Sequence, residues 1–278
     1  MNIAIAPNAE AAPDLEAIKK KQHAAWSDGD YATVGTTLQI VGERIAEALD
    51  LRSGQRVLDV AAGNGNASLA AARRWCDVVS TDYVVEWLNR GRMRADAEGL
   101  KIEFRVADAE DLPFENDSFD AVLSTFGVMF APNQEKSASE MLRVCRRGGK
   151  IGLANWTPDS FIGDLFKTIG RHVPPPAGLK APSLWGTKER LEELFADAVS
   201  AIDATPQKFV FRYRSAGHWI DVWRQTYGPT KKAFAAVGDQ GESALEKDLH
   251  ALVARHNMAT DGTMVVPASY LEVVVAKR

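Results

Sequence analysis

An acidic residue and two glycines stand in the pattern of a nucleotide-binding turn. The stretch VLDVAAGNGN, residues 57–66, runs from apolar residues into a glycine-spaced turn, with Asp59 inside the apolar run. Gly63 and Gly65 permit positive φ and let a ligand approach the backbone closely. A carboxylate beside this turn repels a diphosphate and attracts a ligand that carries a cationic group. Asp59 therefore predicts a cationic ligand, although a role in only ordering the turn stays open.

Polar or aromatic residues also follow the next three apolar runs. Asp82 and Tyr83 come about twenty residues after the glycine turn, where an acid can accept from two ribose hydroxyls and a ring can lie on a base. Asp108 follows the next run and can accept from an exocyclic amine. Phe126 comes after the run 118–125, where it would face the reactive end of the ligand. Each feature is weak alone, because an aspartate after a strand is often only the N-cap of a helix.

These residues fall at the ends of short strands that alternate with helices. The pattern predicts strands at 56–61, 77–82, 101–108, 118–125 and 150–156, with helices at 67–74, 84–98 and 134–143. This alternation indicates right-handed crossovers and a doubly wound parallel sheet of the α/β class. Ligands bind such sheets beyond the carboxyl ends of the strands, where the residues above would meet.

The rest of the chain is expected to cover and close this core. Helical patterns at 18–26 and 34–51 predict an N-terminal helical cap after a loose tail at 1–15. Three consecutive prolines begin at Pro174 and favour an extended segment within a lid insertion. Residues 208–214 and 270–277 alternate like antiparallel strands, with helices at about 216–227 and 241–258 between them. The expected regions are 1–50 (tail and cap), 51–156 (cofactor-binding core), 157–200 (lid and helix) and 201–278 (closing strands and substrate-side helices).

Composition restricts the partners. The chain has 278 residues, 46% of them hydrophobic and 25% charged, and a net charge of −4. This balance gives no strong field that would attract nucleic acid or an anionic membrane, and no apolar run reaches the roughly 18–20 residues of a membrane helix. Cys76 and Cys145 lack metal-ligand spacing, and the N-terminus lacks a secretory pattern. We therefore expect a cytoplasmic protein without a metal, and the sequence leaves a homodimer open.

Four stretches together resemble the motifs of class I S-adenosylmethionine-dependent methyltransferases. In chain order they are VLDVAAGNGN, STD(Y), ADAEDLPFENDSFDAVLS and LRVCRRGGKIGLANW, and the match spans about residues 30–155. The chain is most similar to the small-molecule enzymes typified by those of ubiquinone and menaquinone biosynthesis. The resemblance implies a Rossmann-like, seven-stranded sheet that is mostly parallel with a reversed last strand. The family's first motif is D-x-G-x-G-x-G, and Ala61 replaces its first glycine.

The resemblance also implies a cofactor, S-adenosyl-L-methionine, with S-adenosyl-L-homocysteine as the product. Carried over by position, Asp59 would hold the methionine part, Asp82 the ribose, and Tyr83 and Asp108 the adenine. The other residues implied to bind the cofactor are Tyr31, which resembles a covering ring, Ala61, Gly63, Gly65, Ala109 and Ser124. This cofactor carries an ammonium and a sulfonium but no phosphate, in agreement with an acid near the turn.

The acceptor is expected to bind among the N-terminal cap, residues 156–186 and the helix 216–227. These segments are rich in aromatic residues, which favours a small apolar or aromatic acceptor. An acceptor that must lose a proton needs a general base, and His218 is the best-placed candidate, with a structural role as the alternative. The other expected acceptor-binding residues are Phe126, Trp185, Trp219, Arg224 and Tyr227.

Two other functions stay open. A non-catalytic protein that binds the cofactor in a regulatory or scaffolding role could carry the same turn, and the alanine at position 61 is compatible with it. An NAD-dependent oxidoreductase is less consistent with the residues. Its G-x-G-x-x-G pattern needs a third glycine where Ser68 stands, and it predicts no acid in the first strand.

Overall fold

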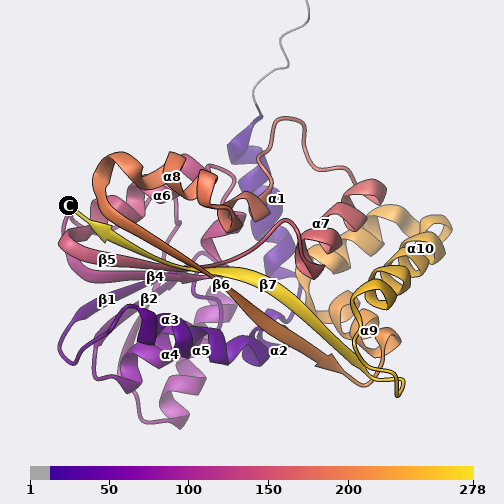
Figure 1. The fold of residues 1–278 in the computed structure, drawn as a ribbon, viewed down its shortest axis with the longest axis horizontal. Helices are drawn as coiled ribbons and strands as arrows, with labels where there is room; N and C mark the ends of the chain where they lie inside the picture. The colour runs from indigo at the N-terminus through magenta and orange to yellow at the C-terminus, as the bar shows by residue number, and fades with distance from the viewer. Residues whose placement is uncertain (1–12) are drawn as a thin grey trace, which may run out of the picture.

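A seven-stranded sheet runs through the computed structural model, which describes residues 13–278 (Figure 1). The strand order is β3-β2-β1-β4-β5-β7-β6. The strands are β1 (Arg56–Val60), β2 (Asp77–Asp82), β3 (Ile102–Val106), β4 (Phe119–Thr125), β5 (Cys145–Trp156), β6 (Val199–Tyr213) and β7 (Met264–Lys277). Among the described strands, β7, the last in the chain, runs opposite to the other six: it pairs antiparallel with β5 and β6, and the remaining pairs are parallel. The predicted doubly wound sheet with a reversed last strand is confirmed.

Helices cover both faces of the sheet and gather at one end of it. In Figure 1, α3, α4 and α5 lie below the sheet and α6 and α8 above it, whereas α7, α9 and α10 lie beyond the carboxyl end of β5. The helices are α1 (Leu15–Ser27), α2 (Tyr31–Gly35), α3 (Gln39–Ala48), α4 (Asn66–Arg73), α5 (Val85–Ala97), α6 (Gln134–Val144), α7 (Phe161–His172), α8 (Lys188–Phe195), α9 (Ala216–Thr226) and α10 (Gly228–His256).

The two faces of β1 enter two different clusters of buried side chains. Leu58 and Val60 pack into the large cluster, which includes Met141 of α6. Val57 packs into the smaller cluster with Ile45 and other residues of α3 and α4. Successive side chains of a strand point to opposite faces, so residue 59 belongs to the face that carries Val57. This alternation decides where the acidic side chain of β1 points.

Several element boundaries differ from the predictions for physical reasons. Helix α1 begins at Leu15, because the Asp14 side chain accepts a hydrogen bond from the Ala17 N–H and caps the helix. The tail predicted for residues 1–15 therefore lies mostly outside the described residues. The helix expected at 241–258 is the second half of α10, which kinks at Gly238, where φ is 61°. Strands β6 and β7 are longer than predicted and pair with each other over their whole length.

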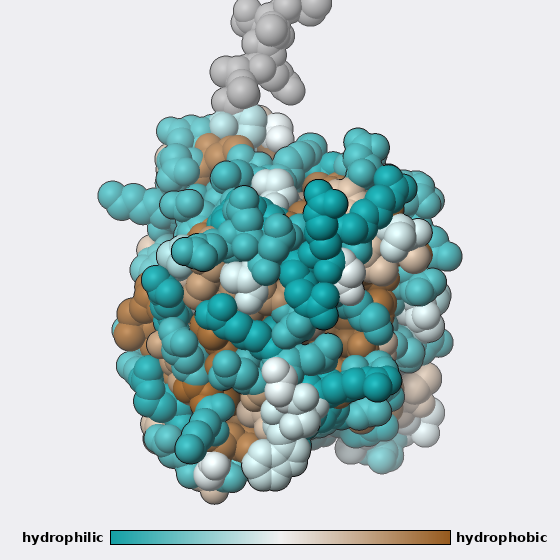
Figure 2. Space-filling model, turned by 90° about the vertical axis from the view of Figure 1, so that its left-hand side faces the viewer, coloured by the Kyte–Doolittle hydropathy of each residue, from teal (hydrophilic) through white to brown (hydrophobic). Residues whose placement is uncertain are grey.

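The opposite end of the sheet, where the parallel strands begin, offers no comparable layer of helices. Figure 2 shows this face, on which hydrophilic residues cover most of the surface and hydrophobic ones are scattered between them. Among residues 13–278, no helix is both long and apolar enough to cross a membrane.

The contact between α3 and α4 yields a test of the packing. A Cβ added at Gly42 would lie 2.6 Å from the Asn66 carbonyl oxygen, whereas one added at Gly170 of α7 would meet nothing closer than 3.8 Å. We expect Gly42→Ala to lower the free energy of unfolding by about 1–3 kcal/mol through overpacking. Gly170→Ala, the control, should raise it by up to about 1 kcal/mol through helix propensity. Urea denaturation measures both values, and equal effects of the two substitutions would contradict the described packing.

Candidate functional site

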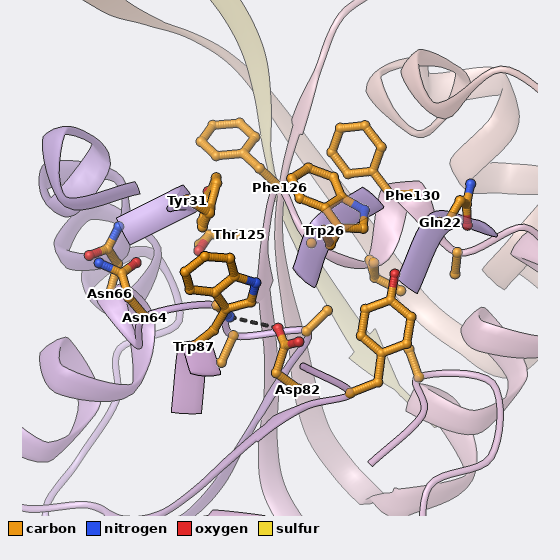
Figure 3. A pocket seen from close by; sticks show the side chains of 18 of the residues that line it. Gln22, Trp26, Tyr31, Asn64, Asn66, Asp82, Trp87, Thr125, Phe126 and Phe130 are labelled. Atoms are coloured by element: carbon orange, nitrogen blue, oxygen red, sulfur yellow. Dashed lines mark hydrogen bonds between the residues drawn. The ribbon is translucent and has the colours of Figure 1, made fainter. Parts of the chain in front are cut away.

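A pocket opens beyond the carboxyl ends of β1, β2, β3 and β4 (Figure 3). The residues that directly follow or end these strands, Ala61, Asp82, Ala107 and Thr125, all line it. Helices α1 and α2 and the residues around α9 supply further parts of the wall. The pocket contains about 1170 Å³ of empty space, its open mouth included. This is the place where open α/β sheets bind ligands.

The turn after β1 has the backbone conformation of a glycine loop although its first glycine position holds Ala61. Ala61, Gly63 and Gly65 all have positive φ, of 52°, 56° and 83°. For alanine this conformation costs roughly 1–2 kcal/mol. A Cβ added at Gly127 would lie 2.1 Å from the Ala61 carbonyl oxygen, so the absence of a side chain at position 127 accommodates the turn. Ala61 and Gly63 line the pocket, whereas Gly65 lies behind it as the N-cap of α4.

The carboxylate of Asp82 is buried in the pocket wall and joins two turns. One oxygen accepts from the Gly63 N–H at 2.9 Å, and the other accepts from the Val84 N–H at 2.9 Å (Figure 3). Burial raises the pKa of Asp82 to about 6, and the backbone N–H donors limit the rise. The group is therefore ionised near neutral pH and can accept further hydrogen bonds from a ligand.

Asp59 lies outside the pocket lining, which corrects the prediction that it holds the ligand directly. It points toward α4, where one oxygen accepts from the Ser68 N–H at 2.8 Å and from the Ser68 hydroxyl at 2.6 Å. Its other oxygen is buried without a hydrogen-bond partner. Burial raises the pKa of Asp59 to about 7, although the bonds from Ser68 lower it. Asp59 therefore orders the turn and the start of α4, which is the alternative role that the sequence analysis left open.

Tyr31 covers the glycine turn from α2. A Cβ at Gly63 would lie 3.0 Å from its ring carbon Cε1, and one at Gly35 would lie 2.8 Å from the same atom. Burial raises the pKa of its phenol, and the nearby Asp82 carboxylate raises it further. The ring thus closes the pocket over the turn as a neutral, hydrogen-bonding group.

Asp108 and Ala109 line the pocket next to Tyr83, but a lysine from α1 binds Asp108. The Lys19 ammonium lies 2.8 Å from the Asp108 carboxylate and 2.6 Å from that of Glu110. Burial opposes the charge on Lys19, yet the two carboxylates outweigh it and raise the pKa of the ammonium. The second oxygen of Asp108 accepts from the Glu110 N–H. Lys19 therefore ties α1 to the loop after β3.

Aromatic rings form the other half of the pocket, which we call the aromatic chamber. Its members are Trp26, Tyr31, Phe126, Phe130, Trp223 and Tyr227. Trp26 stands at its centre, with ring centroids 5.8 Å from Tyr31, 5.1 Å from Phe130 and 5.4 Å from Tyr227. Behind the chamber, Phe126 stacks on Trp156 at 3.9 Å. Phe126 and Tyr227 thus lie where the sequence predicted acceptor-binding residues.

Ser124 lies just below the pocket rather than in its lining. Its hydroxyl donates to the Val60 carbonyl at 2.8 Å and accepts from the Val128 N–H at 3.0 Å, so that it joins β4 to β1. The next residue, Thr125, lines the pocket in its place. The structure therefore places Thr125 rather than Ser124 in the pocket lining, and the expected backbone contact of Ser124 with the cofactor stays a prediction.

Four predicted acceptor-side residues lie away from the pocket, and their placement corrects those predictions. Trp185 is fully buried against Phe195, and Trp219 is buried against Phe161 and Trp223. His218 accepts from the Arg214 N–H through Nδ1 and lies on another face of α9. Arg224 pairs with Glu242 and lies over the Phe234 ring. Tyr227 has extended φ and ψ at the end of α9, so helical spacing does not place it beside Arg224.

The structure also brings in residues that sequence reasoning missed. Lys19 and Gln22 line the pocket from the face of α1 that also carries Trp26, and the i, i+3, i+7 spacing of these three residues was the signal that could have found the first two. Asn64 and Trp87 line it as well, and both are almost completely buried. The Asn64 side-chain oxygen and the Trp87 indole nitrogen have no hydrogen-bond partner. A buried acceptor and a buried donor at a pocket wall indicate a polar ligand.

Residues 58–153 match the model of a methyltransferase domain family. The uncharacterized protein Rv1403c of Mycobacterium tuberculosis is 40% identical over 242 residues, which cover 86% of this chain and 88% of that protein. Demethylmenaquinone methyltransferase of Clavibacter sepedonicus is 36% identical over 132 residues, 46% of this chain and 54% of that enzyme. The YcgJ protein of Bacillus subtilis has the same fold, with a TM-score of 0.60 and 19% identity, over 88% of this chain and 99% of that one.

The sheet and the pocket define a Rossmann-like fold of the methyltransferase type. With the domain match and the sequence relatives, they show that the chain belongs to the class I S-adenosylmethionine-dependent methyltransferases. The resemblance predicted from four motifs is confirmed.

The buried carboxylate of Asp59 predicts a pH dependence of stability. Its pKa in the folded protein, about 7, is above the ordinary value of 3.8, so the folded state binds the proton more tightly than the unfolded state. The stability that protonated Asp59 contributes is therefore fully present below its ordinary pKa of 3.8 and is lost as the pH rises toward its folded-state pKa of about 7. In Asp59→Asn this loss is absent, so the stability of the variant relative to wild type should rise by up to about 1.4 kcal/mol per pH unit between about pH 5 and pH 7.

Urea denaturation at several pH values measures this difference. Asp77→Asn, at the exposed start of β2, is the control and should keep the wild-type pH dependence. A constant difference between wild type and Asp59→Asn across the range would show that Asp59 is ionised in the folded protein throughout.

Proposed function

We propose that this protein transfers the methyl group of S-adenosyl-L-methionine to a small, apolar or aromatic acceptor. The observation that carries the proposal is the Asp82 carboxylate, buried in the pocket wall beside a glycine turn with positive φ. The pocket joins this polar end to the aromatic chamber, so a polar cofactor and an apolar acceptor can meet within it. The acceptor would be a free small molecule, and the proposal includes no nucleic acid or membrane partner.

The residues present fit this cofactor. The Asp82 carboxylate can accept from the ribose hydroxyls, and Tyr83 presents a ring beside it for the adenine. Asp108 and Ala109 would bound the adenine on the side of β3, where Lys19 keeps the Asp108 carboxylate in place. The unpartnered oxygen of Asn64 suits the ammonium of the methionine end, because it is an acceptor without a donor.

The chain's own residues would supply positioning rather than acid–base chemistry. When bound, the cofactor supplies an electrophilic methyl group on a sulfonium. Tyr31 lies over the glycine turn and excludes water from this region, and aromatic faces stabilise a nearby cation by about 0.5–2 kcal/mol. The rings of the aromatic chamber would hold the acceptor in line with the methyl group. Alignment of two reactants can lower a barrier by as much as about 7–11 kcal/mol.

Two alternatives are distinguished by simple measurements. A non-catalytic cofactor-binding protein would bind S-adenosyl-L-methionine without turnover of any acceptor from a panel of phenols, quinols and amines. An NAD-dependent oxidoreductase would bind NADH and ignore the sulfonium compound. The start of α4 favours the methyl-transfer proposal over the oxidoreductase. A dinucleotide fold needs a glycine at position 68, whereas here Ser68 stands there and its hydroxyl bonds the Asp59 side chain.

Calorimetry with substituted proteins tests the proposed cofactor site. We expect S-adenosyl-L-homocysteine to bind the wild-type protein, and Asp82→Asn to weaken this binding by about 10- to 100-fold, because hydrogen bonds to a charged acceptor are lost. Asp77→Asn, which alters the opposite end of the same strand, should bind like wild type. Thermal melting of each variant verifies folding, and equal affinities in all three proteins would contradict the proposed role of Asp82.

A further inference from the structure

The charged residues of the pocket gather at one end of it. Among the described residues that line it, the four charged side chains are Lys19, Asp82, Asp108 and Glu110, and all lie at the ends of β2 and β3 or pair with residues there. The aromatic chamber lies on the other side, around the ends of β4 and α9 (Figure 3). Among the described lining residues, those from Thr125 to Tyr227 include no Asp, Glu, His, Lys or Arg.

His23 of α1 and His218 of α9 are absent from the described pocket lining, and both side chains are hydrogen-bonded. His23 bonds the Tyr83 carbonyl oxygen at 3.2 Å, on the polar side. His218 accepts from the Arg214 N–H and does not line the pocket. The phenols of Tyr31 and Tyr227 are buried, and burial raises the pKa of both. These hydroxyls therefore keep their protons at neutral pH and can donate hydrogen bonds but not remove a proton from an acceptor.

We propose that the acceptor attacks through a lone pair that carries no proton at neutral pH, such as the ring nitrogen of a neutral aromatic heterocycle. This inference rests on the proposed methyl transfer and names its substrate class. The lone pair of nitrogen forms the new N–C bond, and the electrons of the broken C–S bond go to sulfur. The sulfonium becomes a neutral thioether and the nitrogen becomes a quaternary cation. The step therefore releases no proton and leaves the total charge in the site unchanged.

The aromatic chamber suits this transfer because the positive charge moves but does not disappear. Aromatic faces attract a cation through their quadrupole, and they bind quaternary ammonium groups without needing a counter-ion. Trp26 meets Tyr31 and Tyr227 edge to face, at 5.8 Å and 5.4 Å between ring centroids, so these rings touch one another and a cation would lie against the side of the cluster that lines the pocket rather than between the rings. A phenol acceptor would instead leave a proton in a chamber without a base.

Two ligands of equal shape test the charge preference directly. N-methylisoquinolinium and 2-methylnaphthalene differ in the nitrogen that carries the positive charge. We expect calorimetry with the full chain, saturated with S-adenosyl-L-homocysteine, to show about tenfold tighter binding of the cation. Trp26→Leu should abolish this preference, whereas Trp26→Phe, which keeps a ring, should retain most of it. Equal or tighter binding of the neutral compound, or binding of neither, would overturn the inference.

Turnover of a second matched pair separates this inference from the proposed function. Isoquinoline offers a lone pair without a proton, and 2-naphthol offers a hydroxyl on a ring system of the same size. We expect methylation of isoquinoline with kcat/KM about tenfold or more above that of 2-naphthol at neutral pH. Preference for 2-naphthol, or turnover of neither compound, would overturn the substrate class while leaving methyl transfer possible. Failure of the protein to bind S-adenosyl-L-homocysteine would instead overturn the proposed function itself.

Discussion

The hydrogen bonds of the Asp82 carboxylate hold together the polar half of the pocket. They join the turn after β1, through the Gly63 N–H, to the start of α5, through the Val84 N–H. Both turns lie beyond the carboxyl ends of β1 and β2, which pair in parallel register. The cost of burying this carboxylate is visible in its raised pKa, about 6. A ligand that donates hydrogen bonds to it would favour the ionised form, so the site is built to gain from such a ligand.

The N-terminal helix completes both halves of the pocket from one side. Lys19 binds the carboxylates that follow β3, and Trp26, two turns further along α1, stands at the centre of the aromatic chamber. The same helix therefore closes the polar end by charge and the apolar end by packing. Under the proposed function, this division would let polar groups of the cofactor meet hydrogen-bonding partners at one end while an apolar acceptor packs against rings at the other, so that no polar group of the cofactor is buried in the apolar half.

Sequence patterns predicted the strands and the ends of the strands well, because these depend on local features. The run before Asp82 and the run before Asp108 are short, apolar and bounded by polar residues, and both residues lie in the pocket as expected. Side-chain direction was the first source of error. The two-residue alternation of β1 turns Asp59 under the sheet toward α4, and a carboxylate read as a ligand contact proved to cap a helix instead.

Long-range packing was the second source of error. Trp219, Trp223 and Tyr227 contact one another in sequence as tilted rings. Only the position of α9 relative to β6 decides that Trp223 and Tyr227 reach the pocket while Trp219 is buried behind them.

The most direct measurement of the central claim is the number of protons exchanged when S-adenosyl-L-homocysteine binds, from calorimetry in buffers of different ionisation enthalpy. Near pH 6 we expect wild type to release a fraction of a proton, because the ribose hydroxyls stabilise ionised Asp82, and Asp82→Asn to lack this release. Binding without proton release in wild type, or equal release in Asp82→Asn, would contradict the account.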